Sequence, residues 1–200
     1  MAKRRGPQLP KTTTRAHDDC SRESNVEDPR QGDERIRHLV SDGAHLLAAK
    51  RPGEALIKLA EAWELDPQNA AAAINLGGAY ILQGKHDRAI PALEAAVQLE
   101  PNNVMVWTNL AAAYLGKLPL ASEERQNKAI RAYEQALALD PRAPHVHYNL
   151  GLIYLERKDT LRATAHFYGA LESDPSDRDA RYWLDRIRVE DQQQHPTPEG

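Results

Sequence analysis

Histidine and cysteine are the residues of this 200-residue chain whose spacing could support catalysis or metal binding. His145 and His147 lie two residues apart, so on a helix their side chains point to different faces and cannot chelate one metal ion. His38 and His45 lie seven residues apart and could share a helix face, but no further strong ligand accompanies them. Cys20 lies in a polar segment without a helix or a base to activate its thiol. We therefore predict no catalytic residue, no cofactor and no metal site, and a protein that is not an enzyme.

Asparagine is the other polar residue whose spacing indicates a function. Asn75, Asn109 and Asn149 follow one another at intervals of 34 and 40 residues. A carboxamide has both a donor and an acceptor, so a row of three can pair with the N–H and C=O groups of an extended peptide. The alternative is that each carboxamide bonds to neighbouring backbone or to water. A peptide-binding row requires that all three side chains lie on one continuous face.

The charge and hydropathy of the chain exclude several classes of protein and partner. The chain has 26 basic and 29 acidic residues and a formal net charge of −3, so neither nucleic acid nor an anionic membrane is the expected partner. The single cysteine excludes an internal disulfide framework. No segment approaches the roughly 20 apolar residues that span a bilayer, and the basic start lacks the apolar run of a secretory signal. We expect a soluble, cytoplasmic protein without a membrane partner.

Apolar residues are concentrated in the middle of the chain. The first 35 residues contain six of them, and the last ten, from Asp191 to Gly200, contain none. Segments this polar cannot bury enough surface to offset the entropy that ordering would cost. We predict disordered tails at residues 1–34 and 191–200 on either side of a folded domain at residues 35–190.

The predicted domain contains an internal repeat. Four acidic–proline dipeptides end at Pro67, Pro101, Pro141 and Pro175, at intervals of 34, 40 and 34 residues. Each marks the end of a helix, because the residue before a proline is disfavoured in the helical conformation. The segments before the prolines share small and apolar residues at fixed distances. These are Gly43, Gly77 and Gly151 (24 residues before), Ala55, Ala89, Ala129 and Ala163 (12 before), and Leu59, Leu93, Tyr133 and Phe167 (eight before).

Each copy of the repeat has the pattern of two short amphipathic helices. In the second copy, Leu76 and Tyr80 are four residues apart and share a helix face. Ala89, Leu93 and Ala96 form the apolar stripe of the following helix. One such hairpin leaves apolar surface exposed, and neighbouring hairpins cover it by stacking, so the pattern predicts a solenoid.

The pattern resembles the tetratricopeptide repeat, W-x2-L-G-x2-Y, then A-x3-F, then P, across residues 36–175. The resemblance implies an all-α, right-handed α-solenoid of about four helix-turn-helix hairpins plus a C-terminal capping helix. It also implies that Tyr80, Tyr114 and Tyr154 are wedged between hairpins. The implied repeats are 36–69, 70–103, 104–143 and 144–177, followed by a capping helix at 178–190. The matching residues are Ala73, Leu76, Gly77, Tyr80, Ala89, Leu93, Ala96 and Pro101 in the second repeat, and His147, Leu150, Gly151, Tyr154, Ala163, Phe167, Ala170 and Pro175 in the fourth.

The third repeat carries six extra residues between its two helices. The segment from Gly116 to Ala121 is typical of a loop, and Ser122 is placed to cap a longer second helix. We predict an apolar loop that protrudes with Leu118 and Leu120. It is either a tolerated surface insertion or part of a binding face.

The resemblance also implies where a partner binds, because in this family the first helix of each repeat lines the concave side of the superhelix. Around the asparagines this face is apolar and aromatic, which favours an extended or helical peptide segment with apolar anchors. The peptide-binding residues implied by position are Ile74, Asn75, Ile81, Leu82, Met105, Thr108, Asn109, Leu115, His145, Tyr148, Asn149 and Leu152.

One known partner class of the family is not expected. Family members that bind the C-terminal carboxylate of chaperones use lysine, asparagine and arginine at fixed positions of the concave face. Here these positions hold Val40, Ala44, Asn75, Met105 and Asn109. Without the cations, the face cannot neutralise a carboxylate.

The sequence thus predicts a non-catalytic scaffold or adaptor for protein–protein interaction. One alternative is a homo-oligomer that associates through the capping helix or the inserted loop. A second is a nucleic-acid-associated protein that uses residues 1–15, which hold five basic residues and no acid but lack aromatic side chains for stacking. A third is an enzyme subunit whose active site lies on another chain.

Overall fold

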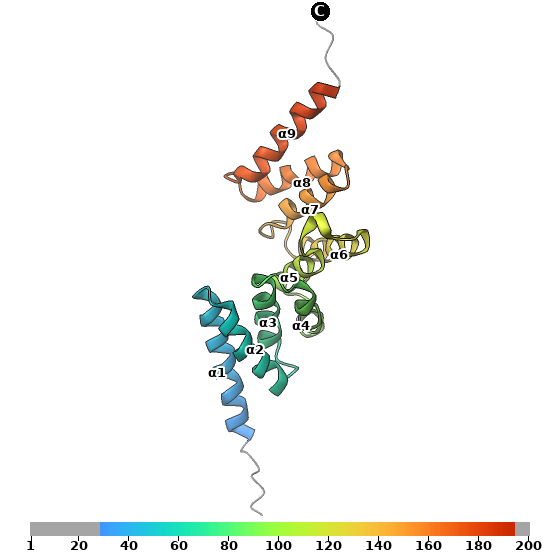
Figure 1. Ribbon diagram of the computed structural model, residues 1–200. Coiled ribbons are helices and arrows are strands. Elements are labelled where there is room, and N and C mark those ends of the chain that lie inside the picture. The colour runs from blue at the N-terminus through green and yellow to red at the C-terminus, as the bar shows by residue number, and fades with distance from the viewer. Residues whose placement is uncertain (1–28, 195–200) are drawn as a thin grey trace, which may run out of the picture.

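The computed structural model describes residues 29–194, and all of their regular secondary structure is helical. The helices follow one another in an open arc, with α1 and α9 at its two ends (Figure 1). This confirms the predicted all-α solenoid. The helices are α1 (Pro29–Ala48), α2 (Pro52–Leu65), α3 (Ala70–Leu82), α4 (His86–Leu99), α5 (Val104–Leu115), η1 (Leu118–Leu120), α6 (Glu123–Leu139), α7 (Val146–Glu156), α8 (Thr160–Ser173) and α9 (Arg178–Gln194).

Consecutive helices pack as hairpins: α1 with α2, α3 with α4, α5 with α6, and α7 with α8. Within three hairpins, a glycine of the first helix lies directly against a large side chain of the second. A Cβ atom added at Gly77 would lie 2.4 Å from Cγ of Leu93, and one at Gly151 would lie 2.7 Å from Cε1 of Phe167. The missing side chains therefore allow the helix axes to approach closely, as the repeat pattern requires.

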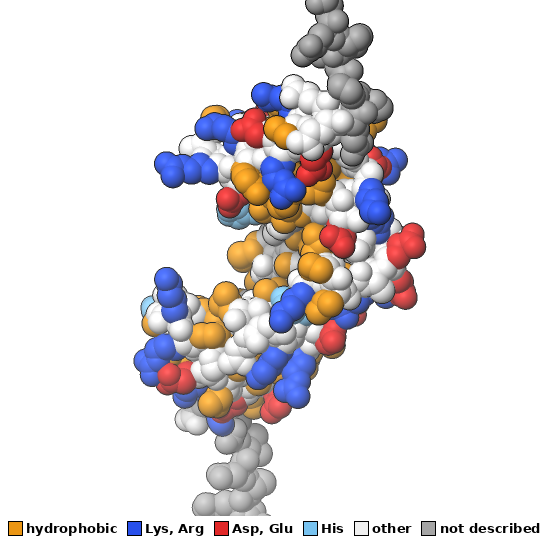
Figure 2. Space-filling model, turned by 45° about the horizontal axis from the view of Figure 1, so that its top comes forward, with side chains coloured by type: hydrophobic (Ala, Val, Ile, Leu, Met, Phe, Trp, Pro, Cys, Tyr) orange, Lys and Arg blue, Asp and Glu red, His pale blue; other side chains and the backbone are white. Residues whose placement is uncertain are grey.

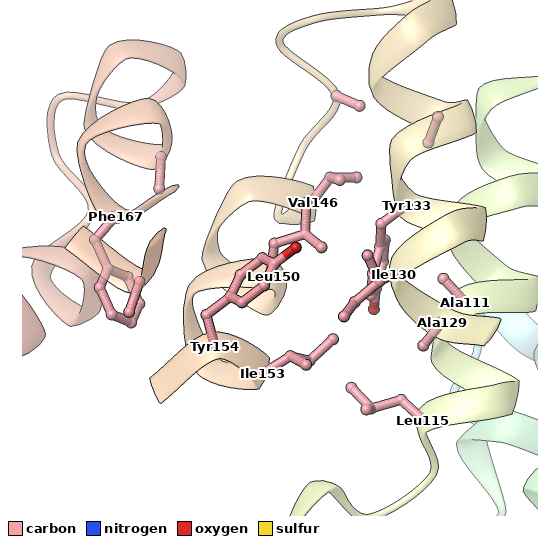
Figure 3. Packing of buried hydrophobic residues seen from close by; sticks show 14 of the residues in the cluster. Ala111, Leu115, Ala129, Ile130, Tyr133, Val146, Leu150, Ile153, Tyr154 and Phe167 are labelled. Atoms are coloured by element: carbon pink, nitrogen blue, oxygen red, sulfur yellow. The ribbon is translucent and has the colours of Figure 1, made fainter. Parts of the chain in front are cut away.

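The core lies within and between these hairpins. Tyr133 of α6 is the largest fully buried side chain and lies beside Val146 and Leu150 of α7 (Figure 3). Tyr154 is buried in the same cluster, and Tyr80 packs against the clusters on both of its sides. The predicted wedging of tyrosines between hairpins is confirmed.

Tyr114 belongs to the same set of wedged tyrosines and also has a polar partner. Its ring packs between the second and third hairpins, and its hydroxyl donates to Oε1 of Glu94 at 2.6 Å. Burial, and then the bond to Glu94, raise the pKa of Tyr114 to about 12. The hydroxyl therefore stays protonated at neutral pH, and links α5 to α4.

Both ends of the helical region differ from the predicted boundaries. Helix α1 begins at Pro29 inside the segment predicted as disordered, and α9 continues to Gln194 rather than 190. Residues 31–35 and 190–193 are polar and mostly exposed, so apolar periodicity gives no sign of these turns. The rest of both predicted tails, residues 1–28 and 195–200, lies outside the described residues. None of the helices between residues 29 and 194 is both long and apolar enough to cross a membrane.

The inserted segment is more ordered than a loop. Leu118 packs against the core of the C-terminal half, whereas Leu120 is exposed, so only part of the predicted protrusion is present. The Ser122 hydroxyl accepts a hydrogen bond from the Arg125 backbone N–H at 3.3 Å, which confirms the predicted cap. Helix α6 has 17 residues against 14 in α4, as the insertion predicts.

Arg125 ties the insertion to the preceding helices. Its Nε donates to the carbonyl oxygen of Tyr114 at 2.8 Å and its Nη2 to that of Ala113 at 3.2 Å, which satisfies the open C-terminal end of α5. Its Nη1 pairs with Asp87 of α4 at 2.5 Å. One side chain therefore fixes the position of α6 relative to α4 and α5.

Candidate functional site

The hollow side of the arc is the candidate site, and we call it the groove. Figure 2 shows the molecule hollowed on one side, with hydrophobic side chains gathered in the hollow. The second helices of the middle hairpins, α4 and α6, lie on the outer side of the arc in Figure 1. The first helices of the repeats, α3, α5 and α7, carry the residues predicted to line the groove.

Three asparagines occupy equivalent places in these three helices. Asn75 lies in α3, Asn109 in α5 and Asn149 in α7, and all three are half-buried. In the part of the chain that the structure describes, their carboxamides make no hydrogen bond to another protein group. Asn69 and Asn103 behave differently, because their side-chain oxygens cap α3 and α5. The three carboxamides therefore retain donors and acceptors for a ligand.

The other residues predicted for the groove differ in exposure. Leu82 is 65% exposed and Met105 is 55% exposed, which suits an apolar contact with a ligand. Ile81, Tyr148 and Leu152 are half-buried. The half-buried Thr108 donates its hydroxyl to the Val104 carbonyl oxygen within α5 at 2.9 Å and so has already used its donor.

Two predicted groove residues are wrong. Ile74 is 6% exposed and Leu115 is 8% exposed, so neither can present its side chain to a ligand. Ile74 lies in a cluster with Val106 of the next repeat, and Leu115 lies in a cluster with Ile153 of the fourth (Figure 3). Position within a repeat cannot reveal these contacts, because they depend on side chains that neighbouring repeats supply.

His145 is exposed but lies before α7 rather than on its concave face. It has a φ of 62° and precedes the first residue of the helix. It lines a cavity of about 470 Å³ together with Tyr148 and the α8–α9 turn, including Asp174. Hydrogen bonds from Ser176 lower the pKa of Asp174, with a smaller contribution from His145. The predicted position on a helix is therefore wrong, although His145 lines the same cavity as Tyr148, another residue predicted for the groove.

Sequence reasoning missed the contribution of α9, which it treated only as a cap. Tyr182 and Val189 are exposed on this helix, and Trp183 stacks on Phe167 with ring centroids 6.4 Å apart. The guanidinium of Arg186 lies 5.7 Å from the centre of the Trp183 ring. The signal was present in the sequence. Tyr182, Trp183 and Arg186 lie 34 residues after the predicted groove residues Tyr148, Asn149 and Leu152.

The predicted lining of the groove therefore changes in character along the arc. The lining predicted on α3 and α5 combines carboxamides with exposed aliphatic side chains. The α7–α9 end is aromatic, since Tyr148 packs on Phe167 at 6.0 Å and Tyr182 on Trp183 at 5.4 Å. Between residues 29 and 194, no three histidine, cysteine or acidic side chains gather as metal ligands. This set of side chains suits binding by hydrogen bonds and apolar contact.

Comparison with known proteins agrees with this architecture. A family model described as "TPR repeat" matches residues 77–117 and 120–157, and two models described as "Tetratricopeptide repeat" match residues 46–89 and 144–177. The chain is 36% identical over 109 residues to the Arabidopsis thaliana "Tetratricopeptide repeat domain-containing protein PYG7, chloroplastic". That match covers 52% of this chain but only 36% of the Arabidopsis protein.

Two solved structures show the same fold. MamA from Desulfovibrio magneticus RS-1 is 25% identical with a TM-score of 0.63, and the match covers 72% of this chain and 78% of that one. PilF of Pseudomonas aeruginosa is 21% identical with a TM-score of 0.67, and the match covers 82% of this chain and 72% of PilF. At this identity the match supports the fold alone. Together with the repeated glycine, tyrosine and proline positions, these matches show that the chain belongs to the tetratricopeptide repeat family.

Proposed function

We propose that this protein is a non-catalytic scaffold or adaptor that binds a peptide segment of a partner protein in its groove. Tetratricopeptide repeats are in general modules of protein–protein interaction, which supports the broader part of the proposal. The observation that carries the specific part is the row formed by Asn75, Asn109 and Asn149. These asparagines lie on the first helices of three consecutive repeats, and within residues 29–194 their carboxamides bond to no other protein group.

The surroundings of the row favour a guest with apolar anchors. Leu82 and Met105 expose most of their surface on the same helices as Asn75 and Asn109, and Tyr182 and Val189 of α9 expose about half of theirs. Exposed apolar surface in a concave site usually marks an interaction site. A peptide that bonds its backbone to the carboxamides would place alternate side chains against these residues.

Replacing all three asparagines by alanine tests the proposal. Peptides are first selected on the full chain from a random display library, and their dissociation constants are measured by calorimetry. We expect the triple variant to bind about 10- to 2,000-fold more weakly, because each of the three lost hydrogen bonds contributes about 0.5–1.5 kcal/mol. A variant with Gln98→Ala and Gln135→Ala removes exposed carboxamides from α4 and α6 and should bind like the wild type.

Circular dichroism of each variant establishes that the helices remain folded. An unchanged affinity of the folded triple variant for every selected peptide would contradict the role of the asparagines. Equal weakening by the α4 and α6 control variant would contradict the assignment of the peptide to the groove.

Self-association is a second candidate function, and one surface favours it. Leu161, Ala165 and Tyr168 form an exposed stripe along α8, and Leu161 is 83% exposed. We expect Leu161→Lys to lower any concentration-dependent rise in mass that light scattering detects, because a charge would enter the apolar contact. A wild-type protein that stays monomeric at every concentration would remove this candidate.

A further inference from the structure

Two histidines face each other inside the fourth hairpin. Nδ1 of His147 in α7 lies 3.2 Å from Nδ1 of His166 in α8, and Nε2 of His147 lies 3.2 Å from the carbonyl oxygen of Pro141. A carbonyl oxygen only accepts, so Nε2 of His147 carries the proton in that bond. Nδ1 of neutral His147 is then the acceptor, and Nδ1–H of His166 is the donor. The two bonds tie α7 to α8 and to the turn that precedes α7.

This arrangement leaves little freedom to the two rings. His166 stacks on Tyr154 with ring centroids 5.4 Å apart and an angle of 4° between the planes. His147 is bounded by Gly169 of α8, where an added Cβ atom would lie 2.7 Å from its Nδ1. The pair therefore cannot turn to a new hydrogen-bonding arrangement without moving one helix away from the other.

Protonation of both rings disturbs the hairpin. A single added proton leaves the bond in place, because the Nδ1 that carries a hydrogen donates to the other Nδ1. A second proton would place two Nδ1–H groups and two positive charges against each other at a distance that requires one acceptor. A proton on Nε2 of His166 would place a charge at a half-buried site. Burial, and then the neighbouring His147, lower the pKa of His166 below its ordinary value.

Several charged groups surround the pair. The α6–α7 turn supplies Arg142, and the α8–α9 turn supplies Asp174 and Asp177, which line the same cavity as His147. Asp179 of α9 lines it too. From α8 itself, Arg162 lies 5.4 Å from the centre of the Tyr154 ring. Arg162 lies over the Tyr154 ring that stacks on His166, and its positive charge disfavours a second positive charge there.

We propose that the His147–His166 pair is a pH-sensitive latch that holds the fourth hairpin closed at neutral pH and loosens it in mild acid, as both rings become charged. The folded hairpin binds fewer protons than the unfolded chain, because the pKa of His166 is lowered in the folded state. The stabilisation is therefore fully present above about pH 6.5, the ordinary pKa of histidine, and falls as the pH drops below it. The loosening concerns the free protein and does not depend on what the groove binds.

Hydrogen exchange of the full chain, read by mass spectrometry at about pH 7.5 and about pH 5.5, tests the latch. Protection is corrected for the intrinsic pH dependence of exchange and compared between residues 146–173 and residues 70–99. We expect α7 and α8 to lose several-fold more protection in acid than α3 and α4. Equal losses in the two regions would overturn the proposal.

Matched variants separate the latch from a general effect of acid. His166→Phe keeps a ring to stack on Tyr154 but removes the titrating group and the bond, so α7 and α8 should show no additional loss in acid. His166→Asn keeps an N–H donor for His147 and should show a smaller loss than the wild type. His38→Phe removes an exposed histidine from α1 and should retain the full loss. An undiminished loss in His166→Phe, or in His166→Asn if only that variant folds, would contradict the latch.

Discussion

Replacing Phe167 by alanine should lower the free energy of unfolding by about 3–5 kcal/mol, the range observed when a buried aromatic side chain is truncated. Phe167 is fully buried, and its ring lies against Gly151 on one helix and stacks on Trp183 on another. Its removal would leave a cavity where α7, α8 and α9 meet. Urea denaturation followed by far-ultraviolet circular dichroism measures the change.

A residue of the same helix provides the control for Phe167. Leu161 also lies in α8 but is largely exposed, so Leu161→Ala should change the free energy of unfolding by no more than about 0.5 kcal/mol. The fluorescence of Trp183 should report unfolding of α9 at lower urea in the Phe167 variant, because repeats in a solenoid depend on their neighbours. Similar effects of the two substitutions would be incompatible with the packing of α8.

Gly77→Ala should destabilise the protein by about 1–3 kcal/mol, although alanine is the better helix former. The added Cβ atom would lie 2.4 Å from Cγ of Leu93, and the two adjacent methyl groups of Leu93 lie within 3 Å as well. Leu93 is fully buried, so it cannot move aside without displacing α4. The strain would therefore appear as a shift of the second hairpin rather than as a local change of rotamer.

The same substitution at the neighbouring Gly78 is expected to stabilise the protein rather than destabilise it. A Cβ atom at Gly78 would meet no other heavy atom within 4 Å, so Gly78→Ala should stabilise the protein by about 0.5–1 kcal/mol through helix propensity alone. Both variants are compared with the wild type by thermal and urea denaturation under one set of conditions. A stabilising Gly77→Ala would show that α3 and α4 are not in close contact.

Much of the fold follows from sequence because the relevant signals are local. Apolar residues three and four apart determine which face of each helix is buried, and the acidic–proline dipeptides end the second helix of each hairpin. The small residue at positions such as Gly77 and the large residue at positions such as Leu93 recur at fixed spacing, so their contact is predictable from the repeat. The three asparagines were found in the same way.

Other features were decided only by contacts between repeats. Burial of Ile74 and Leu115 depends on side chains from the following hairpins, which the pattern within one repeat does not specify. The link between His147 and His166 depends on the rotation of α7 against α8. Periodicity reports which face of a helix is apolar. Which side chains cover that face, and which polar groups meet there, depends on the distances and angles at which whole helices pack.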